Sequence, residues 1–212
     1  MAKDKKRNKK PQNNASGFHM PDVSLGLYSY NGNTLIDTED YNEVLQNRDL
    51  PPVPERRYGG EGGLLLTIGR LFFDMSGEGR GGQMQRGAYI TSFGYGHGEF
   101  NIGYVWKKNR LFRFYPMLGV GGAGSAIHTE KKEGIGDERN LEPLRTEVNA
   151  VLQHIGLGLD FTPRLGPIRF FLGIRAGYAH PRYTTPPATP HRDRVKVGGF
   201  YLRFIWGIAF QR

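Results

Sequence analysis

The feature that most constrains this chain is the strict alternation of its last strand-like run, residues 199–210. Apolar side chains occupy every second position of this run: Phe200, Leu202, Phe204, Trp206, Ile208 and Phe210. Successive side chains of a β-strand point to opposite faces, so this stripe forms one continuous hydrophobic face. The other face carries Arg203 among small residues and Tyr201. An apolar face backed by an arginine is typical of the wall of a small membrane barrel, which is apolar outside and polar inside.

The same alternation recurs along most of the chain. Six such runs cover about residues 63–75, 87–106, 110–128, 146–161, 167–181 and 197–212. Long connections at 76–86, 129–145 and 182–196 alternate with short ones at 107–109 and 162–166. An up-and-down barrel with long outer loops and tight inner turns produces this order. The sequence therefore predicts an all-β, antiparallel transmembrane barrel of about eight strands, with residues 23–30 as the best candidate for a further strand.

The phase of each run predicts which side chains face lipid and which face the barrel interior. The predicted lipid-facing set comprises Ile102, Tyr104 and Trp106 together with the terminal stripe. The predicted interior polar network comprises Arg70, Glu99, Arg113, His154, Asp160, Arg169, Arg175 and Arg203. Such an interior is cationic, and an eight-stranded barrel is just wide enough for side chains, so we expect arginine–carboxylate ladders with trapped water rather than a wide pore.

One run departs from the pattern. In residues 87–106 the aromatic side chains occupy odd positions early and even positions late, with Gly94, Gly96 and Gly98 between them. A glycine bulge that shifts the phase by one residue accounts for this change, and so does splitting the run into two strands. We expect the bulge, because splitting the run destroys the alternation of long and short connections.

Three regions follow from this division. Residues 1–21 are predicted to be a disordered basic arm, because lysine and arginine in the first ten residues supply more than half of the net charge of +9. Residues 22–61 form an N-terminal segment with a strand, an acidic stretch that looks helical and a proline-rich connector, and residues 62–212 form the barrel. We hypothesise that the acidic stretch from Asp37 to Glu43 caps or enters the cationic interior.

Three stretches resemble the small outer-membrane β-barrel proteins of Gram-negative bacteria, the group that includes the opacity-type adhesins and the transmembrane domain of outer membrane protein A. They are FRFYPMLGVGGAG at 112–124, IGLGLDFTPRLGPIRFFLGIRAGY at 155–178 and YLRFIWGIAF at 201–210. The last of these is similar to the C-terminal signal that barrel-assembly machinery reads, although Gln211 and Arg212 follow it. The resemblance implies a location in the bacterial outer membrane. The residues after the lysine run contain no apolar segment of a signal peptide, so we expect either a mature form or a protein that is not exported.

Candidate sites for catalysis and cofactors are few. The chain has no cysteine, which excludes disulfides, thiol nucleophiles and cysteine-based metal sites. His97, His128, His154 and His180 lie on four different runs without metal-ligand spacing, so the sequence predicts no catalytic group, metal or other cofactor. The segment from His128 to Glu130 is the one local candidate for catalysis, and it lacks a serine.

Three classes of function remain open at this point. The favoured class is a non-enzymatic outer-membrane barrel with a structural, adhesive or accessory role in the envelope. Its expected partners are the lipid bilayer, lipopolysaccharide and, through the N-terminal arm, other envelope proteins, with no role for nucleic acid. The second class is a soluble calycin-like barrel that binds a small apolar ligand, and the third is a lipid-modifying outer-membrane enzyme.

Overall fold

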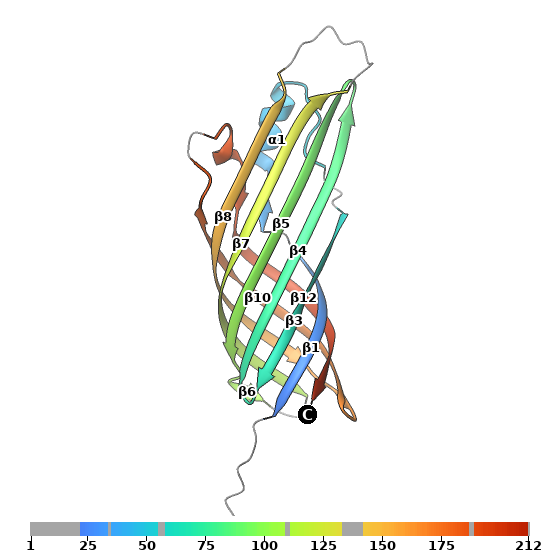
Figure 1. Cartoon of the computed structure of the whole chain (residues 1–212), viewed down its shortest axis with the longest axis vertical. Helices are drawn as coiled ribbons and strands as arrows, with labels where there is room; N and C mark the ends of the chain where they lie inside the picture. The colour runs from blue at the N-terminus through green and yellow to red at the C-terminus, as the bar shows by residue number, and fades with distance from the viewer. Residues whose placement is uncertain are drawn as a thin grey trace, which may run out of the picture.

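Eight long strands form a closed antiparallel barrel in the computed structural model, which describes residues 22–33, 35–54, 58–108, 111–132, 142–186 and 189–211 (Figure 1). The strands are β1 (Val23–Gly32), β3 (Tyr58–Ile68), β4 (Leu71–Arg86), β5 (Tyr89–Tyr104), β7 (Phe112–Lys131), β8 (Leu144–Phe161), β10 (Ile168–Tyr183) and β12 (Gly199–Gln211). Each strand pairs with its neighbours in this order, and β12 pairs with both β10 and β1. The ring is therefore closed, and the predicted fold class is confirmed.

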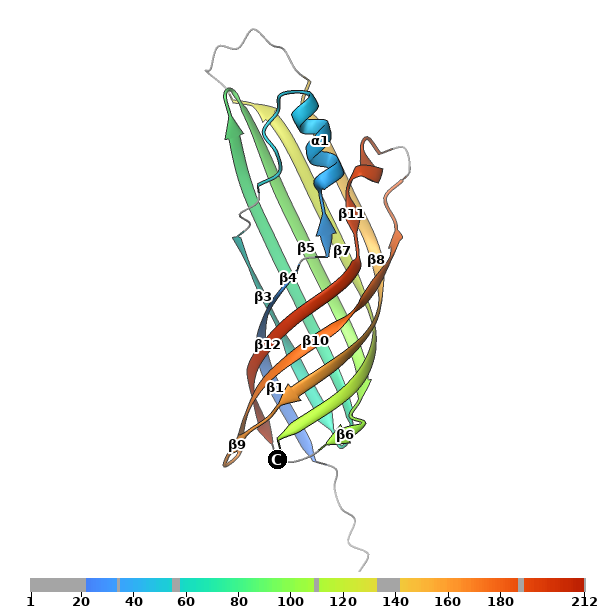
Figure 2. The same ribbon diagram turned by 180° about the vertical axis from the view of Figure 1, so that it is seen from behind.

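Short elements decorate the two ends of the barrel. At one end, β6 (Lys107–Lys108) pairs with β7 and β9 (Arg164–Leu165) pairs with β10. At the other end lie β2 (Ile36–Asp37), α1 (Glu39–Asn47), the 3-10 helix η1 (Arg192–Arg194) and β11 (Lys196–Val197), and β2 pairs with β11 (Figure 2). Within the described part of the chain, no helix combines the length and the apolar character needed to cross a bilayer.

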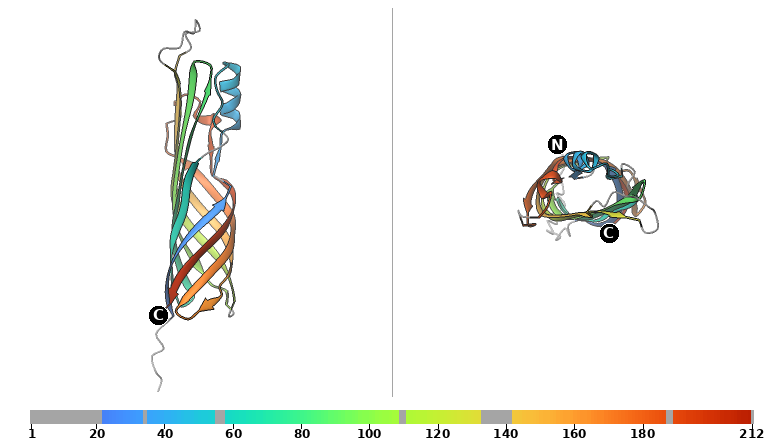
Figure 3. Two further views of the ribbon diagram at one scale, coloured as in Figure 1. Left: turned by 90° about the vertical axis from the view of Figure 1, so that its right-hand side faces the viewer. Right: turned by 90° about the horizontal axis from the view of Figure 1, so that it is seen from above.

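At the end that carries α1, several strands continue well beyond the length needed to cross a bilayer. Strands β4, β5, β7 and β8 continue above the cylinder as a curved sheet, and α1 faces this sheet from the opposite side (Figure 3). We call this upper part the extension. A tilted transmembrane strand needs about 9–11 residues, whereas β7 has 20 and β8 has 18. The chain enters β1 and leaves β12 at the opposite end, where the connections are short (Figure 1).

Two strand boundaries predicted between residues 63 and 86 are wrong. The run 63–75 is not one strand but the hairpin of β3 and β4, with Gly69 at a φ of 62° in the two-residue turn between them. A glycine adopts this left-handed conformation without steric cost, so the turn is tight enough to be hidden inside an apolar run. The predicted long connection 76–86 is the upper half of β4, and the true connection to β5 is the turn at Gly87 and Ala88.

The predicted bulge in residues 87–106 is also wrong. The register between β5 and both neighbouring strands is uninterrupted, and the odd residues of β5 face inward along its whole length. What changes along the strand is its surroundings. The outward residues of the lower half are exposed apolar or aromatic side chains, Phe100, Ile102 and Tyr104. The upper half lies in the extension, where the inward residues Tyr89 and Phe93 belong to a core. The apparent phase shift therefore marks the level at which the strand leaves the apolar layer.

The N-terminal segment is partly integrated into the barrel. β1 is a barrel strand that pairs with β3 and β12, and β3 begins at Tyr58, so the predicted barrel start at residue 62 is corrected. The acidic stretch forms the expected helix, α1. The predicted basic arm, residues 1–21, lies outside the described residues.

Candidate functional site

The outer surface of the cylinder is a continuous apolar belt, to which every barrel strand contributes exposed side chains. The predicted lipid-facing residues all belong to this surface: Ile102, Tyr104, Trp106, Phe200, Leu202, Phe204, Trp206, Ile208 and Phe210. Phe200 is 81% exposed and Trp106 is 71% exposed, although both are large aromatic residues. A soluble calycin-like barrel turns its apolar face inward, so this belt contradicts that alternative and fits a barrel whose outer face contacts lipid.

The lower half of the barrel interior is filled by paired charges. Arg175, the largest of the fully buried side chains, donates to Asp74 at 2.8 Å and to the hydroxyl of Tyr28 at 3.0 Å. Arg113 donates to Asp160 at 3.3 Å, and Tyr115 donates to the other oxygen of Asp160 at 2.9 Å. These contacts pair buried charges across the barrel, from β1, β4, β7, β8 and β10. An eight-stranded barrel is just wide enough inside for side chains of this kind.

The upper half of the interior is organised around Glu99 on β5. One of its carboxylate oxygens, Oε1, accepts hydrogen bonds from Ser76 at 3.0 Å, from Asn101 at 3.2 Å and from Arg203. The guanidinium of Arg203 also lies 4.8 Å above the ring centroids of both Tyr30 and Tyr201. Arg203 and Glu99 therefore form a buried ion pair that is fixed from several strands.

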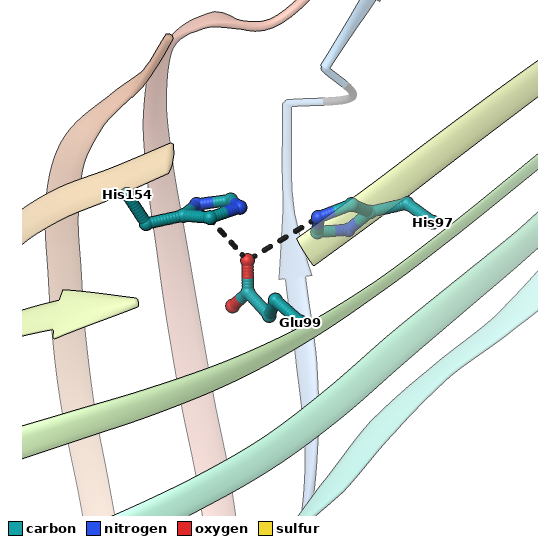
Figure 4. Close-up of side chains that lie close together, drawn as sticks. All are labelled: His97, Glu99 and His154. Carbon is teal, nitrogen blue, oxygen red and sulfur yellow. Dashed lines mark ion pairs between the residues drawn. The ribbon is translucent and has the colours of Figure 1, made fainter. Parts of the chain in front are cut away.

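The second oxygen of Glu99 faces two histidines (Figure 4). Oε2 lies 3.3 Å from Nε2 of His97 and 3.3 Å from Nδ1 of His154, and the two rings are 5.5 Å apart between centroids. The sequence predicts no metal-ligating group because the histidines lie on different runs, but the structure brings three donor atoms of His97, Glu99 and His154 within 4.8 Å of one another. His97 shares its strand face with Glu99, but the approach of His154 from β8 depends on how the barrel closes.

The other predicted interior residues are placed as follows. Glu99, Arg113, His154, Asp160, Arg169, Arg175 and Arg203 are all buried inside the barrel. Arg70 is a correction, because it is exposed in the turn between β3 and β4, and its Nη1 lies 3.4 Å from the hydroxyl of Tyr104. The sequence pattern assigned residues 63–75 to a single strand, and Arg70 was therefore wrongly predicted to face the barrel interior.

The predicted excess of positive charge in the interior is corrected as well. Among the described residues, the buried arginines Arg113, Arg169, Arg175 and Arg203 are matched in number by Asp74, Glu78, Glu99 and Asp160. A further half-buried pair joins Arg80 to Glu61 at 3.0 Å. Glu78 and Glu61 lie in or beside the stretch that the sequence assigned to a loop and a connector. The interior therefore needs no acidic segment from elsewhere to neutralise it.

The hypothesis that the acidic stretch enters the barrel is accordingly not supported. α1 packs in the extension through its apolar face: Tyr41 and Leu45 are buried, and the hydroxyl of Thr146 on β8 donates to that of Tyr41 at 3.3 Å. Asp37, Glu39 and Glu43 are exposed. Asp40 pairs with Lys196 at 2.9 Å, and this hydrogen bond holds the pKa of Asp40 below its ordinary value. The segment closes the open side of the extension with apolar contacts instead of neutralising buried arginines.

The catalytic candidate on β7 lies on the outer face of the extension. Nε2 of His128 is 3.2 Å from Glu130, and the strand register places Ser92 of β5 directly opposite His128. The sequence alone did not reveal this serine, because it belongs to another strand. Ser92 is about 26 Å along β5 from Phe100, the uppermost belt residue of that strand, at ~3.3 Å per residue. Bilayer lipids therefore lie far from this group, which argues against a lipid-modifying enzyme.

Comparison with known proteins supports the fold. The chain is similar to a major outer membrane protein from Thermus thermophilus, with 11% sequence identity, a TM-score of 0.53 and coverage of 92% of this chain and 100% of that one. It is also similar to Ail, the attachment invasion locus protein of Yersinia pestis, with 11% identity, a TM-score of 0.50 and coverage of 91% and 99%. No protein-family model and no curated protein matches the sequence.

The chain thus has the fold of outer-membrane β-barrels. Its closed antiparallel fold is shared with these two structures, and its belt of exposed apolar side chains is of the kind that lipid covers. In such barrels the short turns face the periplasm and the longer connections face outward. The extension lies at the end of the barrel opposite the short turns (Figure 1).

Proposed function

We propose that this protein is a non-enzymatic, surface-exposed binding component of the bacterial outer membrane, with an adhesive role carried by its extension. The observation that carries the proposal is the contrast between the two halves of the molecule. The interior of the cylinder is filled by fixed ion pairs, so it supports no transport, whereas the extension has a folded core of its own. A rigid, exposed platform without a channel is suited to binding at the cell surface.

A core of buried side chains holds the extension rigid, so that it forms a folded platform and not a set of loops. It joins buried residues of α1 and of the segment after it to inward residues of β5, β7 and β8: Tyr41, Leu45, Leu50, Val53, Tyr89, Phe93, Ile127 and Val148. The hydroxyl of Thr91 on β5 also donates to the backbone oxygen of Pro51 at 2.6 Å. Binding surfaces held rigid in this way lose less entropy when a partner binds. The similarity to Ail, the attachment invasion locus protein of Yersinia pestis, is consistent with this role.

Lipid and lipopolysaccharide are the partners of the lower half in this proposal. Directly above the belt, two rows of outward glycines run across four strands in register: Gly62, Gly77, Gly98 and Gly122, then Gly60, Gly79, Gly96 and Gly124. A Cβ added at Gly60, Gly79 or Gly96 would meet open space, so the fold itself does not require glycine there. Side-chain-free strands at this level let the sugar and phosphate groups of lipopolysaccharide approach the backbone closely.

Shortening the β4–β5 hairpin tests the adhesive role. Gly81 and Gly94 are register partners, so residues 82–93 can be replaced by Asn-Gly, a sequence that favours a two-residue hairpin turn. Bacteria of a non-adherent strain that display the wild-type chain should adhere to cultured epithelial cells, and the shortened variant should lower adhesion by about tenfold or more, as expected when hot-spot contacts are lost.

The matched control replaces the turn residues Gly69 and Arg70 by Asn-Gly at the periplasmic end, and it should adhere like the wild type. Surface amounts are equalised by labelling intact cells, and folding is checked by the shift in electrophoretic mobility on heating. The proposal fails if the shortened variant adheres as well as the wild type at equal surface amounts, or if the wild type adheres no better than the empty strain.

A further inference from the structure

We propose that His97, Glu99 and His154 bind a divalent transition-metal ion, such as Zn²⁺, inside the barrel near the upper edge of the belt. The three side chains come from two strands, β5 and β8, and they converge on one point (Figure 4). Their side chains are 0%, 2% and 1% exposed, respectively. Two imidazoles and one carboxylate form a ligand set that zinc sites use, with a fourth position for water or an anion.

Two of the three separations between the donor atoms match such an ion, and the third, between the histidine nitrogens, lies within 4.8 Å, so the two rings would close toward a bound ion. A zinc ion with ligands at about 2.0–2.1 Å in a tetrahedron separates those ligands by about 3.3–3.4 Å. The oxygen Oε2 of Glu99 lies 3.3 Å from Nε2 of His97 and 3.3 Å from Nδ1 of His154. Neither contact has the geometry of a hydrogen bond, because Oε2 and all four ring nitrogens have no hydrogen-bond partner among the described residues. Buried polar atoms are usually satisfied, so three such atoms that converge within 4.8 Å of one another indicate a ligand.

The surroundings of Glu99 prepare it for this role. Its other oxygen, Oε1, is held by Ser76, Asn101 and Arg203, so Oε2 has a fixed direction and remains available to the histidines. Hydrogen bonds that orient a ligating carboxylate in this way raise metal affinity. Arg203 therefore neutralises the carboxylate through Oε1, and Oε2 is left to the histidines.

Cobalt binding to the whole chain tests the proposal, because four-coordinate Co²⁺ has a visible absorption spectrum that reports its geometry. The tag-free protein is refolded into detergent with Co²⁺, and Zn²⁺ is then used to displace it. We expect one Co²⁺ per folded chain, the spectrum of a four-coordinate ion, and loss of binding in His97→Ala and His154→Ala. His180→Ala removes an exposed histidine of β10 and is the matched control, which should bind like the wild type.

A second measurement keeps the test decisive if either alanine variant fails to fold. X-ray absorption of the zinc-loaded wild type should show two imidazoles and at least one oxygen, with ligands at about 2.0–2.1 Å. The proposal is overturned if the folded wild type binds no Co²⁺, or if the two alanine variants fold and still bind it. It is also overturned if the X-ray absorption spectrum of the zinc-loaded protein shows a different ligand set. The adhesion experiment does not involve this cluster, so the two proposals can fail independently.

Discussion

At the scale of single residues, the interior of the barrel holds three buried arginine–carboxylate pairs among the described residues: Arg175 with Asp74, Arg113 with Asp160 and Arg203 with Glu99. Arg175 shows the principle most clearly, since its guanidinium is fully buried and bonded to Asp74, Tyr28 and Tyr115. Removing one partner of such a pair leaves the other charge buried without compensation, and this is far more costly than removing both.

We therefore predict that Arg175→Met destabilises the barrel by about 3–5 kcal/mol. The double variant Arg175→Met with Asp74→Asn should recover most of that loss. Urea unfolding of the refolded protein in lipid vesicles measures both values. Arg182→Met is the matched control, because Arg182 is an exposed arginine on the same strand, and it should change the free energy of unfolding by less than about 0.5 kcal/mol. Equal destabilisation by the single and double variants would contradict the pairing argument.

Strand phase predicts which side chains are inside, but not which of them meet. Arg113, Arg175 and Arg203 are buried as their phase indicates, because alternation is a local property of a strand. The partners of these arginines come from strands up to 147 residues away in the sequence, as the bond between Arg175 and Tyr28 shows. The cluster of His97, Glu99 and His154 was not predicted for the same reason, since His154 of β8 approaches His97 of β5 across the intervening strand β7.

At the scale of elements, the attachment of α1 depends on η1 and is sensitive to pH. The ring of His191, just before η1, lies edge-on to the ring of Tyr41 in α1, with 6.1 Å between centroids. Burial of His191, followed by the nearby charges of Arg48 and Arg194, lowers the pKa of its imidazole below the ordinary 6.5. A lowered pKa means that the folded state favours the neutral ring, so its stabilising contribution is present above pH 6.5 and is lost as the pH falls through the folded value.

Amide hydrogen exchange in α1 and η1 should therefore become faster as the pH falls below 6.5, after correction for the intrinsic rate. The variant His191→Gln should remove this dependence, because glutamine does not titrate. The pair of Asp40 and Lys196 does not mimic the effect, since the carboxylate of Asp40 has a lowered pKa and stays ionised in this range. An unchanged pH dependence in His191→Gln would show that another group controls the attachment.

Elements were easiest to predict where the environment along a strand is uniform. The run that became β12 is apolar outside over its whole length, and its prediction holds. β4 was missed because its upper half has Gly77, Gly79 and Gly81 where its lower half has apolar residues. Alternation of apolar and polar residues shows that the two faces of a strand have different surroundings. It does not report the strand itself, so it is lost where a strand extends beyond the lipid.

At the scale of the whole molecule, the barrel should be closed to ions by its own interior and not by the N-terminal segment. We predict no stable open channel in planar bilayers for the wild type. Replacing residues 36–53, which include α1, by a flexible Gly-Ser linker should leave the barrel closed, because the side-chain network of the cylinder is untouched. Steady conductance in this variant alone would restore the idea that the segment acts as a plug.

The up-and-down barrel could be predicted from the sequence, because connection lengths and the terminal stripe both indicate it. The six recognisable runs were too few, and the number of about eight strands came from the minimum for single-chain barrels of this kind. The height of the molecule could not be predicted. It depends on the upper half of β4 and on the core around α1, where the inward side becomes apolar and the outward side does not.

The level at which the strands change character also fixes how deeply the molecule is immersed. The row of Leu64, Met75, Phe100 and Val120 is the last apolar one on this side, and the next row consists of glycine. A rise of one row, about 6.6 Å at ~3.3 Å per residue, would bring these side chains into water at about 1.5–3 kcal/mol each for the larger ones. The opposite movement would bring polar backbone into hydrocarbon. Displacement of the barrel along the membrane normal is therefore unfavourable in both directions. The tip of the extension is held at a constant distance from the bilayer.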